Sequence, residues 1–320
     1  MKLATLTNAY SQFLFKPQPV QSVVIFRFLL GSLLLLNWYM TWQHLDIFWS
    51  PQGLVSLATS QSYWAGPRFS FFDFLPDIPQ VGRWIAILNL LGIIGLLLGF
   101  WTRTSIAIAF FTLISFHFRK TFILNSADVI MRNFLFFLFF TPCADMWSLD
   151  RWRALKKGTA PLVPLEKAPW ALRLLQIQFC LIYISTVLFK IQGKAWIDGT
   201  AVYYATRLDE FLRFQFSLLD NIAVVKFATW STLVIEFALG TLVWIREFRY
   251  WVLLAGVGLH IGIDLTMNIP IFEWLMIAGM IVMIPSKDFD YLMQTIRDGN
   301  VRMYVSRTLR FPLLSRRALK

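Results

Sequence analysis

A lysine at the end of an apolar segment is the first residue whose type and place point to chemistry. The stretch from Leu181 to Gly199 reads LIYISTVLFKIQGKAWIDG, so Lys190 closes an apolar run. Tyr183, Thr186 and Lys190 recur at three- and four-residue spacing and would share one face of a helix. Such a lysine either extends its amine to the membrane surface or lies among apolar groups. In the second case desolvation disfavours the charged form, and the amine could act as a base.

A glutamate and a histidine form a second candidate pair. Glu236 and His260 lie at similar depth in two consecutive apolar segments of opposite direction. An isolated carboxylate in lipid is costly, so we expect Glu236 to hydrogen-bond to His260. Asp264, one helical turn after His260, would point to the same side. The pairing fits either a structural role or proton transfer.

An aspartate and an arginine mark a third position. In the segment NSADVIMR, Asp128 precedes Arg132 by four residues, which is the spacing of an ion pair within a helix. Ionised side chains near hydrocarbon are expected to face the interior of a helix bundle rather than lipid. The pair is either purely structural or part of a polar site.

Other site types have no signature in the sequence. The three histidines show neither HExxH nor cluster spacing, so no metal site is expected. Cys143 and Cys180 form no CxxC motif and are expected to be packing residues. The net charge of +12 is spread over loops and a tail, which argues against nucleic acid as a partner.

The composition indicates that a membrane-spanning bundle positions these residues. Of 320 residues, 57% are hydrophobic and only 15% are charged, unlike soluble domains. Crossing a bilayer takes about 17 to 25 apolar residues. The sequence predicts an all-α bundle with about eight spans, of which the third, fourth and eighth are short. They are Val23–Trp42, Trp84–Trp101, Arg103–Phe118, Val129–Thr141, Ala171–Phe189, Phe227–Ile245, Tyr250–Met267 and Ile271–Ile284.

The positions of lysine and arginine predict the orientation of the bundle. With both termini inside, most basic residues fall on the cytoplasmic face, as the positive-inside rule requires. The predicted organisation is a cytoplasmic segment 1–22, a transmembrane domain 23–285 and a basic cytoplasmic tail 286–320. The tail either lies on anionic membrane lipid or is a partner-binding or disordered segment. Ala201–Leu219 has apolar residues at helical spacing and is predicted to be an interfacial helix over the outer side.

Several stretches, taken in order along the chain, resemble the horizontally transferred transmembrane (HTTM) domain family, which includes the vitamin K-dependent gamma-carboxylase. They are Arg27, NSADVIMR ending at Arg132, TPCADMWSLDRW from Thr141, LFKIQGKAWIDGTAVYYA from Leu188, Glu236, and LHIGIDLTMNI from Leu259. The resemblance covers nearly the whole chain. It implies an outward-opening apolar cavity for reduced vitamin K, another quinone or another isoprenoid lipid.

The resemblance also implies roles for the candidate residues. Lys190 best matches the lysine that deprotonates the reduced quinone in the carboxylase. Lys194 is a second candidate, because the segment before Trp196 is one residue longer here. His260 and Glu236 would shape the cavity, and the expected cofactor-binding residues are Asp128, Arg132, Tyr183, Trp196 and Asp264.

Three functions are compatible with these expectations. The first is a quinone-dependent carboxylase-like or oxygenase-like enzyme, a lyase in class, in a bacterial inner membrane. The second is a non-enzymatic membrane factor that binds lipid or assists maturation of an exported peptide or protein. The third is a proton-coupled transporter, although no inverted repeat is visible in the sequence.

Overall fold

The computed structural model describes residues 2–64 and 66–297, and this part of the chain is all-α, as predicted. It divides into two compact units, Met1–Leu175 (unit 1) and Gln176–Lys320 (unit 2), which are described separately below. Helix α9, Trp170–Lys190, contributes residues to both units. The part of the tail that follows Arg297 lies outside the described residues.

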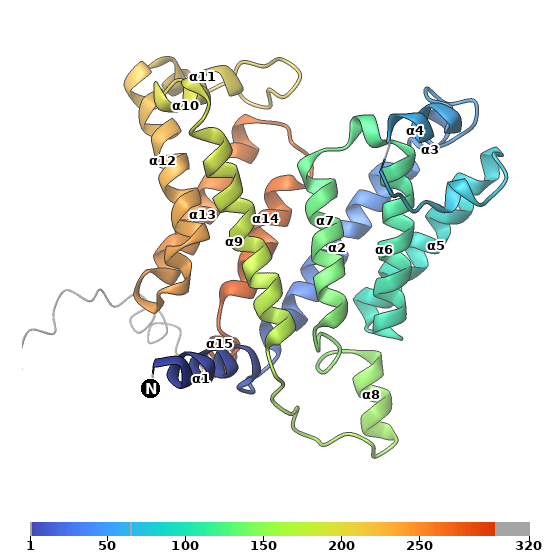
Figure 1. Ribbon diagram of the computed structural model, residues 1–320, viewed down its shortest axis with the longest axis vertical. Coiled ribbons are helices and arrows are strands. Elements are labelled where there is room, and N and C mark those ends of the chain that lie inside the picture. The colour runs from blue at the N-terminus through green and yellow to red at the C-terminus, as the bar shows by residue number, and fades with distance from the viewer. Residues whose placement is uncertain (1, 65, 298–320) are drawn as a thin grey trace, which may run out of the picture. The chain divides into compact units, whose positions relative to one another are not determined.

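Three helices form the centre of unit 1 (Figure 1). Helix α5 packs against α2 on one side and against α6 on the other. Gly92 and Gly95 of α5 face Ala109 and Ser105 of α6 so closely that a Cβ atom would clash. Small residues at such a crossing let two helices approach in a membrane. The helices of unit 1 before α9 are α1 Lys2–Phe15, α2 Gln21–Trp42, α3 Leu45–Phe48, α4 Leu57–Tyr63, α5 Pro79–Leu98, α6 Thr102–Arg119, α7 Ser126–Phe140 and α8 Leu149–Lys156.

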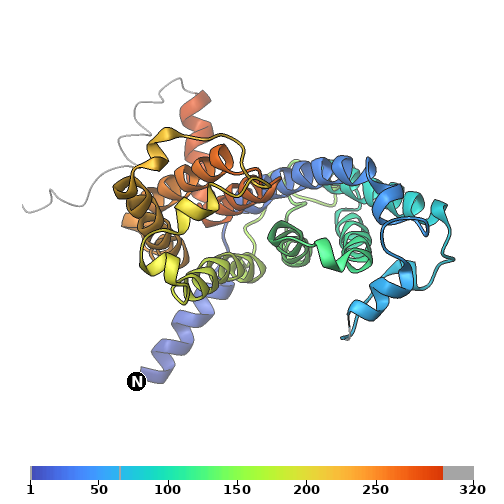
Figure 2. The same ribbon diagram turned by 90° about the horizontal axis from the view of Figure 1, so that it is seen from above.

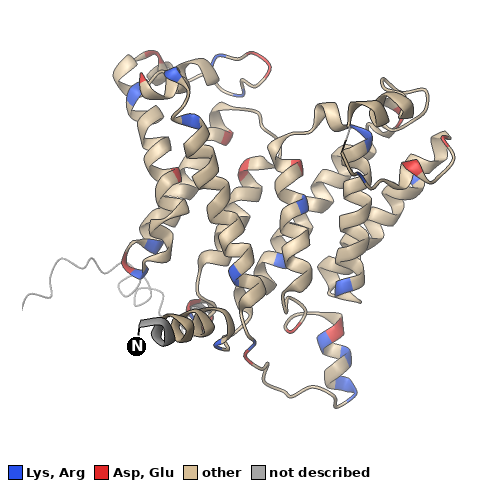
Figure 3. Ribbon diagram, in the orientation of Figure 1, with Lys and Arg blue, Asp and Glu red and all other residues tan. Residues whose placement is uncertain are grey.

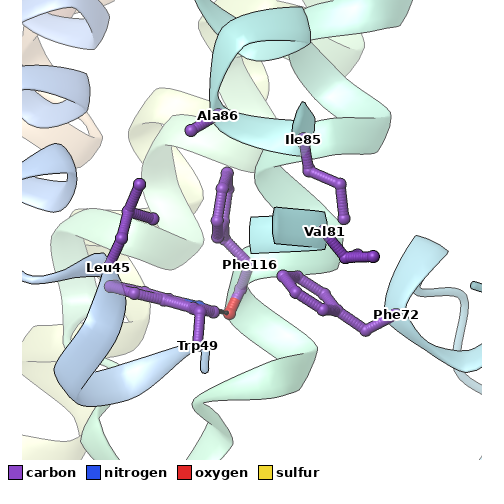
Figure 4. Close-up of a cluster of buried hydrophobic side chains, with 7 residues drawn as sticks. All are labelled: Leu45, Trp49, Phe72, Val81, Ile85, Ala86 and Phe116. Carbon is purple, nitrogen blue, oxygen red and sulfur yellow. Dashed lines mark hydrogen bonds between the residues drawn. The ribbon is translucent and has the colours of Figure 1, made fainter. Parts of the chain in front are cut away.

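A compact apolar cluster lies where the first long loop of unit 1 meets α5 and α6. The ring of Trp49 packs edge-on against Phe116, and its indole nitrogen donates to the Phe116 carbonyl oxygen at 3.1 Å. Figure 4 shows both rings beside Phe72 and the apolar side chains of α5. The cluster fixes the loop on the helices and consists of Leu45, Trp49, Phe72, Val81, Ile85, Ala86 and Phe116.

Two fully buried arginines of unit 1 bind backbone carbonyl oxygens. Arg27 on α2 donates to Cys143 and Trp147, at 2.9 and 2.6 Å. Arg119 at the end of α6 donates to the carbonyl oxygen of Val55 at 2.8 Å. In Figure 2, α6 and α7 are seen nearly end-on, and α2, which carries Arg27, runs across them. Each arginine therefore holds one loop against the helices.

Unit 2 holds the second half of α9 and the helices that follow it. Gly240 of α12 leaves space for Ile184 of α9, and Gly256 of α13 leaves space for Met280 of α14. These close approaches bring α9, α12, α13 and α14 together around their polar residues. The further helices are α10 Lys194–Ile197, α11 Ala201–Ala205, α12 Ile222–Gly240, α13 Arg246–Thr266, α14 Phe272–Met280 and α15 Ser286–Arg297.

Five of the described helices are long and apolar enough to cross a membrane. These helices, α2, α5, α9, α12 and α13, correspond to the predicted first, second, fifth, sixth and seventh spans. The three segments predicted to be short are also helical: they form α6, α7 and α14, the last extended by a 3-10 turn to Met283. Figure 3 shows helix surfaces with few charged residues. The chain is an integral membrane protein, and the number eight stays a prediction.

The prediction of an interfacial helix over Ala201–Leu219 is wrong for the residues after Ala205. Helix α11 ends at Ala205, and the following segment turns back to the end of α13. There Leu212 pairs with Met267 in an isolated bridge, and the amide of Arg213 donates to the carbonyl oxygen of Thr266 at 3.1 Å. These backbone hydrogen bonds replace the ones that a continued helix would make.

Candidate functional site

An ion pair joins the end of α9 to the middle of α12. Lys190 Nζ lies 2.5 Å from Glu236 Oε1, and the two side chains are 21% and 8% exposed. The same ammonium lies 4.7 Å from the centre of the Trp196 ring, which α10 places beside it. A cation over an aromatic face and next to a carboxylate is held in one place. Lys190 is therefore neither bathed in solvent nor extended freely to the membrane surface.

A chain of three hydrogen-bonded side chains, called the polar chain below, links α9, α13 and α14. The hydroxyl of Tyr183 lies 2.8 Å from His260 Nε2. On the other side of the ring, His260 Nδ1 contacts the carboxylate of Glu273. All three side chains are almost fully buried.

The hydrogen-bond requirements of this chain assign the positions of its protons. With Glu273 as a carboxylate, which only accepts, His260 Nδ1 carries the proton and donates to Glu273. His260 Nε2 is then the acceptor, and the Tyr183 hydroxyl donates to it. The result is a directed chain from Tyr183 through His260 to Glu273, along which a proton can move in steps.

The ion pair and the polar chain meet on α9. Tyr183 and Lys190 are seven residues apart and share one helix face. Glu236 and Glu273 both lie close enough to the Tyr183 hydroxyl to act on it electrostatically. Among the described residues, Glu236 Oε2 and Glu273 Oε1 are buried oxygens without a hydrogen-bond partner. Each has a free lone pair that can accept a hydrogen bond or a proton.

Glu273 is the member of this site that sequence reasoning missed. It lies in the first turn of α14, where a carboxylate interacts favourably with the helix dipole. The preceding Ile271 has a φ of 69°, rare for a β-branched residue, and this backbone turn starts the helix. An acidic residue near the start of a short apolar span was the available signal.

A cleft of about 290 Å³ lies between α11, α12 and α13, and its lining includes neither Glu236 nor His260. Thr232 and Ile235 of α12 line it and precede Glu236 by one turn or less. Gly258 and Gly262 of α13 line the opposite side, and a Cβ atom at either would meet nothing within 4 Å. The two glycines therefore leave this wall of the cleft free of side chains.

The structure brings together most, but not all, of the residues predicted for this site. Lys190, Glu236, Tyr183, His260 and Trp196 belong to it. The predicted hydrogen bond between Glu236 and His260 is wrong, because each has another partner. Glu236 pairs with the long side chain of Lys190, which reaches back along α9, and His260 pairs with Glu273.

Two further candidates of unit 2 lie elsewhere. Asp264 forms an ion pair with Arg213 at 2.9 Å, which ties the 211–213 segment to α13. Lys194 is exposed at the start of α10. The geometry therefore selects Lys190 rather than Lys194 as the lysine of the polar site.

Asp128 and Arg132 belong to unit 1 and do not form the predicted ion pair there. Asp128 lies 3.2 Å from His117 Nε2 and 3.9 Å from Lys120 Nζ, and it also caps the start of α7. Arg132 lies over the ring of Phe118, 6.0 Å from its centre. Burial lowers the pKa of Lys120, in the turn after α6, although Asp128 opposes this shift. The cluster fixes the turn between α6 and α7.

No group of three or more His, Cys, Asp or Glu side chains that could hold a metal ion occurs among residues 2–64 and 66–297. Both cysteines are free and buried, as expected of packing residues. Burial raises the pKa of the Cys143 thiol to about 11, which leaves it in the unreactive protonated form.

Comparison with known proteins identifies the family. No solved structure matches the chain. The model of the HTTM domain matches residues 15–287, which is most of the sequence and includes the site just described. The chain therefore belongs to the HTTM domain family, which includes the membrane region of the vitamin K-dependent gamma-carboxylase.

Proposed function

We propose that unit 2 contains the proton-transfer site of a carboxylase-like or oxygenase-like membrane enzyme that uses a reduced quinone. The observation that carries the proposal is the ion pair of Lys190 and Glu236, held under Trp196 and partly accessible. Ionisable side chains inside a membrane bundle are costly and usually mark function. The match to the HTTM family makes a quinone the favoured class of ligand.

The pair of Lys190 and Glu236 can exchange one proton internally. Ammonium with carboxylate and amine with carboxylic acid hold the same number of protons. When the shared proton rests on Glu236, Lys190 Nζ is a free amine that can accept a proton from a bound substrate. Tyr183, next on the same face of α9, begins the chain that leads a proton through His260 to Glu273.

Two features of unit 2 support a quinone as the ligand. A bound reduced quinone would supply a dissociable phenolic proton and two electrons, with dioxygen as the electron acceptor. Glu236 Oε2 and Glu273 Oε1 are unused acceptors for its hydroxyl groups. The cleft beside α13 offers an apolar wall of Leu259, Ile263 and Ile235 to a ring or an isoprenoid tail.

The proposal includes a topology for the chain. In it, α6, α7 and α14 also cross the bilayer, which gives eight spans with both termini on the cytoplasmic side of a bacterial inner membrane. The basic loops favour this orientation. It places the end of α9, and hence Lys190, near the outer surface.

The experiment compares Lys190→Ala with Lys194→Ala in lipid nanodiscs. The readout is oxygen uptake on addition of a reduced long-chain quinone, after subtraction of the uptake in empty discs. We expect Lys190→Ala to lose about 100-fold to 10,000-fold, the usual contribution of a positioned acid or base. Lys194→Ala is the matched control and should stay near the wild-type rate, because Lys194 is exposed. Equal rates for the wild type and Lys190→Ala would end the proposal.

A non-enzymatic role is the second candidate, and the loop after α11 favours it. This loop exposes several large apolar side chains: Leu208, Phe211, Phe214, Phe216 and Leu218. An exported peptide or a lipid could dock on such a surface. Loss of function on changing Trp196, with tolerance of Lys190→Ala, would favour this role over the enzyme.

A further inference from the structure

Unit 1 contains a groove that has no role in the proposed reaction. It has a volume of about 460 Å³, within the range of about 300–1,000 Å³ found for small-molecule sites. Residues of α2, α5, α8 and the loop before α8 form its walls, chiefly Phe28, Leu97, Leu98, Trp147, Leu149 and Trp152. Its lining is therefore almost entirely apolar.

The groove lies at the end of a spanning helix. Leu98 is the last residue of α5 and is 53% exposed. Trp147 and Trp152, at the other wall, are 48% and 56% exposed. Tryptophan side chains prefer the boundary between hydrocarbon and headgroups. The groove thus opens where an acyl chain ends and a headgroup begins.

Arg27 fixes the loop that carries Trp147 at the rim of the groove. Its guanidinium donates to the carbonyl oxygen of Trp147 at 2.6 Å and lies 4.4 Å from the centre of the Phe28 ring. Trp147 itself has a φ of 47°, an uncommon backbone conformation for a large residue. The groove is therefore a preformed feature of unit 1 rather than a gap between loosely packed side chains.

Basic side chains border the groove along α8. Figure 3 shows basic positions along α8 and an acidic position near its start. Lys156 Nζ lies 5.3 Å from the centre of the Trp152 ring, and Arg153 lies 4.3 Å from that of Phe100. Arg153 and Lys156 are both exposed. Their charges are available to a ligand whose apolar part lies in the groove.

The nearby carboxylates do not neutralise these cations. Asp150 accepts hydrogen bonds from the amides of Trp101 and Thr102, at 2.9 and 2.8 Å, and so caps α6. Asp145 pairs with Lys167 at 3.5 Å. An anionic headgroup is therefore the complement of the charged rim.

We propose that this groove binds an anionic phospholipid, with an acyl chain along Leu98 and Trp152 and its phosphate beside Arg153 and Lys156. A bilayer surrounds the protein with such molecules, and the site requires both an apolar chain and a negative charge. The lipid ties α8 to the membrane surface at the end of α5. This role is independent of the polar site of unit 2.

The test is native mass spectrometry of the full chain after incubation with equal amounts of phosphatidylglycerol and phosphatidylcholine. We expect the wild type to retain phosphatidylglycerol preferentially. The variant Arg153→Gln/Lys156→Gln should bind it about thirtyfold more weakly, because each basic side chain near a headgroup contributes to binding. Arg246→Gln/Lys287→Gln removes the same charge from exposed residues of unit 2 and should bind as the wild type does.

A second pair of variants tests the groove rather than the charge. Leu98→Trp fills the groove and should abolish retention of both lipids. Leu91→Trp places the same side chain at a 60% exposed position of α5 outside the groove and should change nothing. Undiminished retention of phosphatidylglycerol by Arg153→Gln/Lys156→Gln would overturn the proposal. So would a copurified peptide, or a second copy of the chain, that Leu98→Trp displaces.

Discussion

The buried arginines of unit 1 and the buried Lys190 and His260 of unit 2 bind different kinds of partner. In unit 1, Arg27 and Arg119 bind backbone carbonyl oxygens and close loops over the helices. In unit 2, Lys190 and His260 bind the carboxylates of Glu236 and Glu273, which come from other helices. Burying a charge in either unit costs free energy that only good partners offset. Backbone partners fix a loop, whereas ionisable partners can also exchange a proton.

The atoms without a hydrogen-bond partner sharpen this contrast. Among the described residues of unit 1 they include the Nε atoms of Arg27 and Arg119, which do not lose their protons in proteins. In unit 2 they are carboxylate oxygens of Glu236 and Glu273, which can accept one. His117 Nδ1, in the residue that pairs with Asp128, is the exception in unit 1, because an imidazole nitrogen can also exchange a proton.

Substitution of the two buried histidines should show the largest difference between the units. His260→Gln interrupts the chain between Tyr183 and Glu273 and should lower quinol-dependent oxygen uptake by about 100-fold or more. His117→Gln removes a histidine that is equally buried but lies in the last turn of α6 and pairs with Asp128. It should leave the uptake per folded molecule nearly unchanged. Parallel losses in the two variants would show that the units do not differ in role.

The arginine of unit 1 provides the next largest effect. Arg27→Met leaves the carbonyl oxygens of Cys143 and Trp147 without their donor, and should lower the free energy of unfolding by on the order of 3 kcal/mol. Denaturant unfolding in detergent measures the change. Arg103→Met, at an exposed position of α6, should cost less than about 0.5 kcal/mol. An equal cost for both variants would contradict the loop-closing role of Arg27.

The smallest expected effect is a pH dependence in the first long loop. Burial pushes the pKa of Asp73 up, but hydrogen bonds from Arg68 and Gln61 outweigh it and hold the pKa below its ordinary value of 3.8. The stabilisation is therefore present above pH 3.8 and is lost as the pH falls through the lower value of the folded protein. Asp73→Asn should lower the melting temperature near neutral pH, and acid should remove the difference. A difference that persists in acid would contradict this contribution.

The sequence predicted which residues carry the site better than it predicted their partners. Lys190, Glu236 and His260 stand out because each is ionisable within an apolar span. Their pairing depends on helix rotation and on the reach of a lysine side chain, which depth along a span does not specify. Asp264 shares a helix face with His260, but Arg213 pairs with it from a segment that was predicted to be helical.

The fold was predictable to a similar degree. The five long helices follow from the length and apolarity of their segments. The end of α11 did not follow, because backbone pairing between residues 211–213 and the end of α13 competes with the local helical pattern. Glu273 was missed because it lies near the end of a short span, where an acidic residue is also compatible with a place at the membrane surface.

The central claim is that Lys190 and Glu236 serve proton transfer and not only the packing of α9 on α12. Lys190→Met and Glu236→Met each leave one buried charge alone and should cost about 3–5 kcal/mol of stability. The double variant removes both charges and should recover most of that stability.

The decisive measurement is the quinol-dependent oxygen uptake of Lys190→Met/Glu236→Met in nanodiscs, beside its free energy of unfolding. The account predicts a stable protein without uptake. A double variant that is stable and takes up oxygen at the wild-type rate would contradict it, because the pair would then be purely structural.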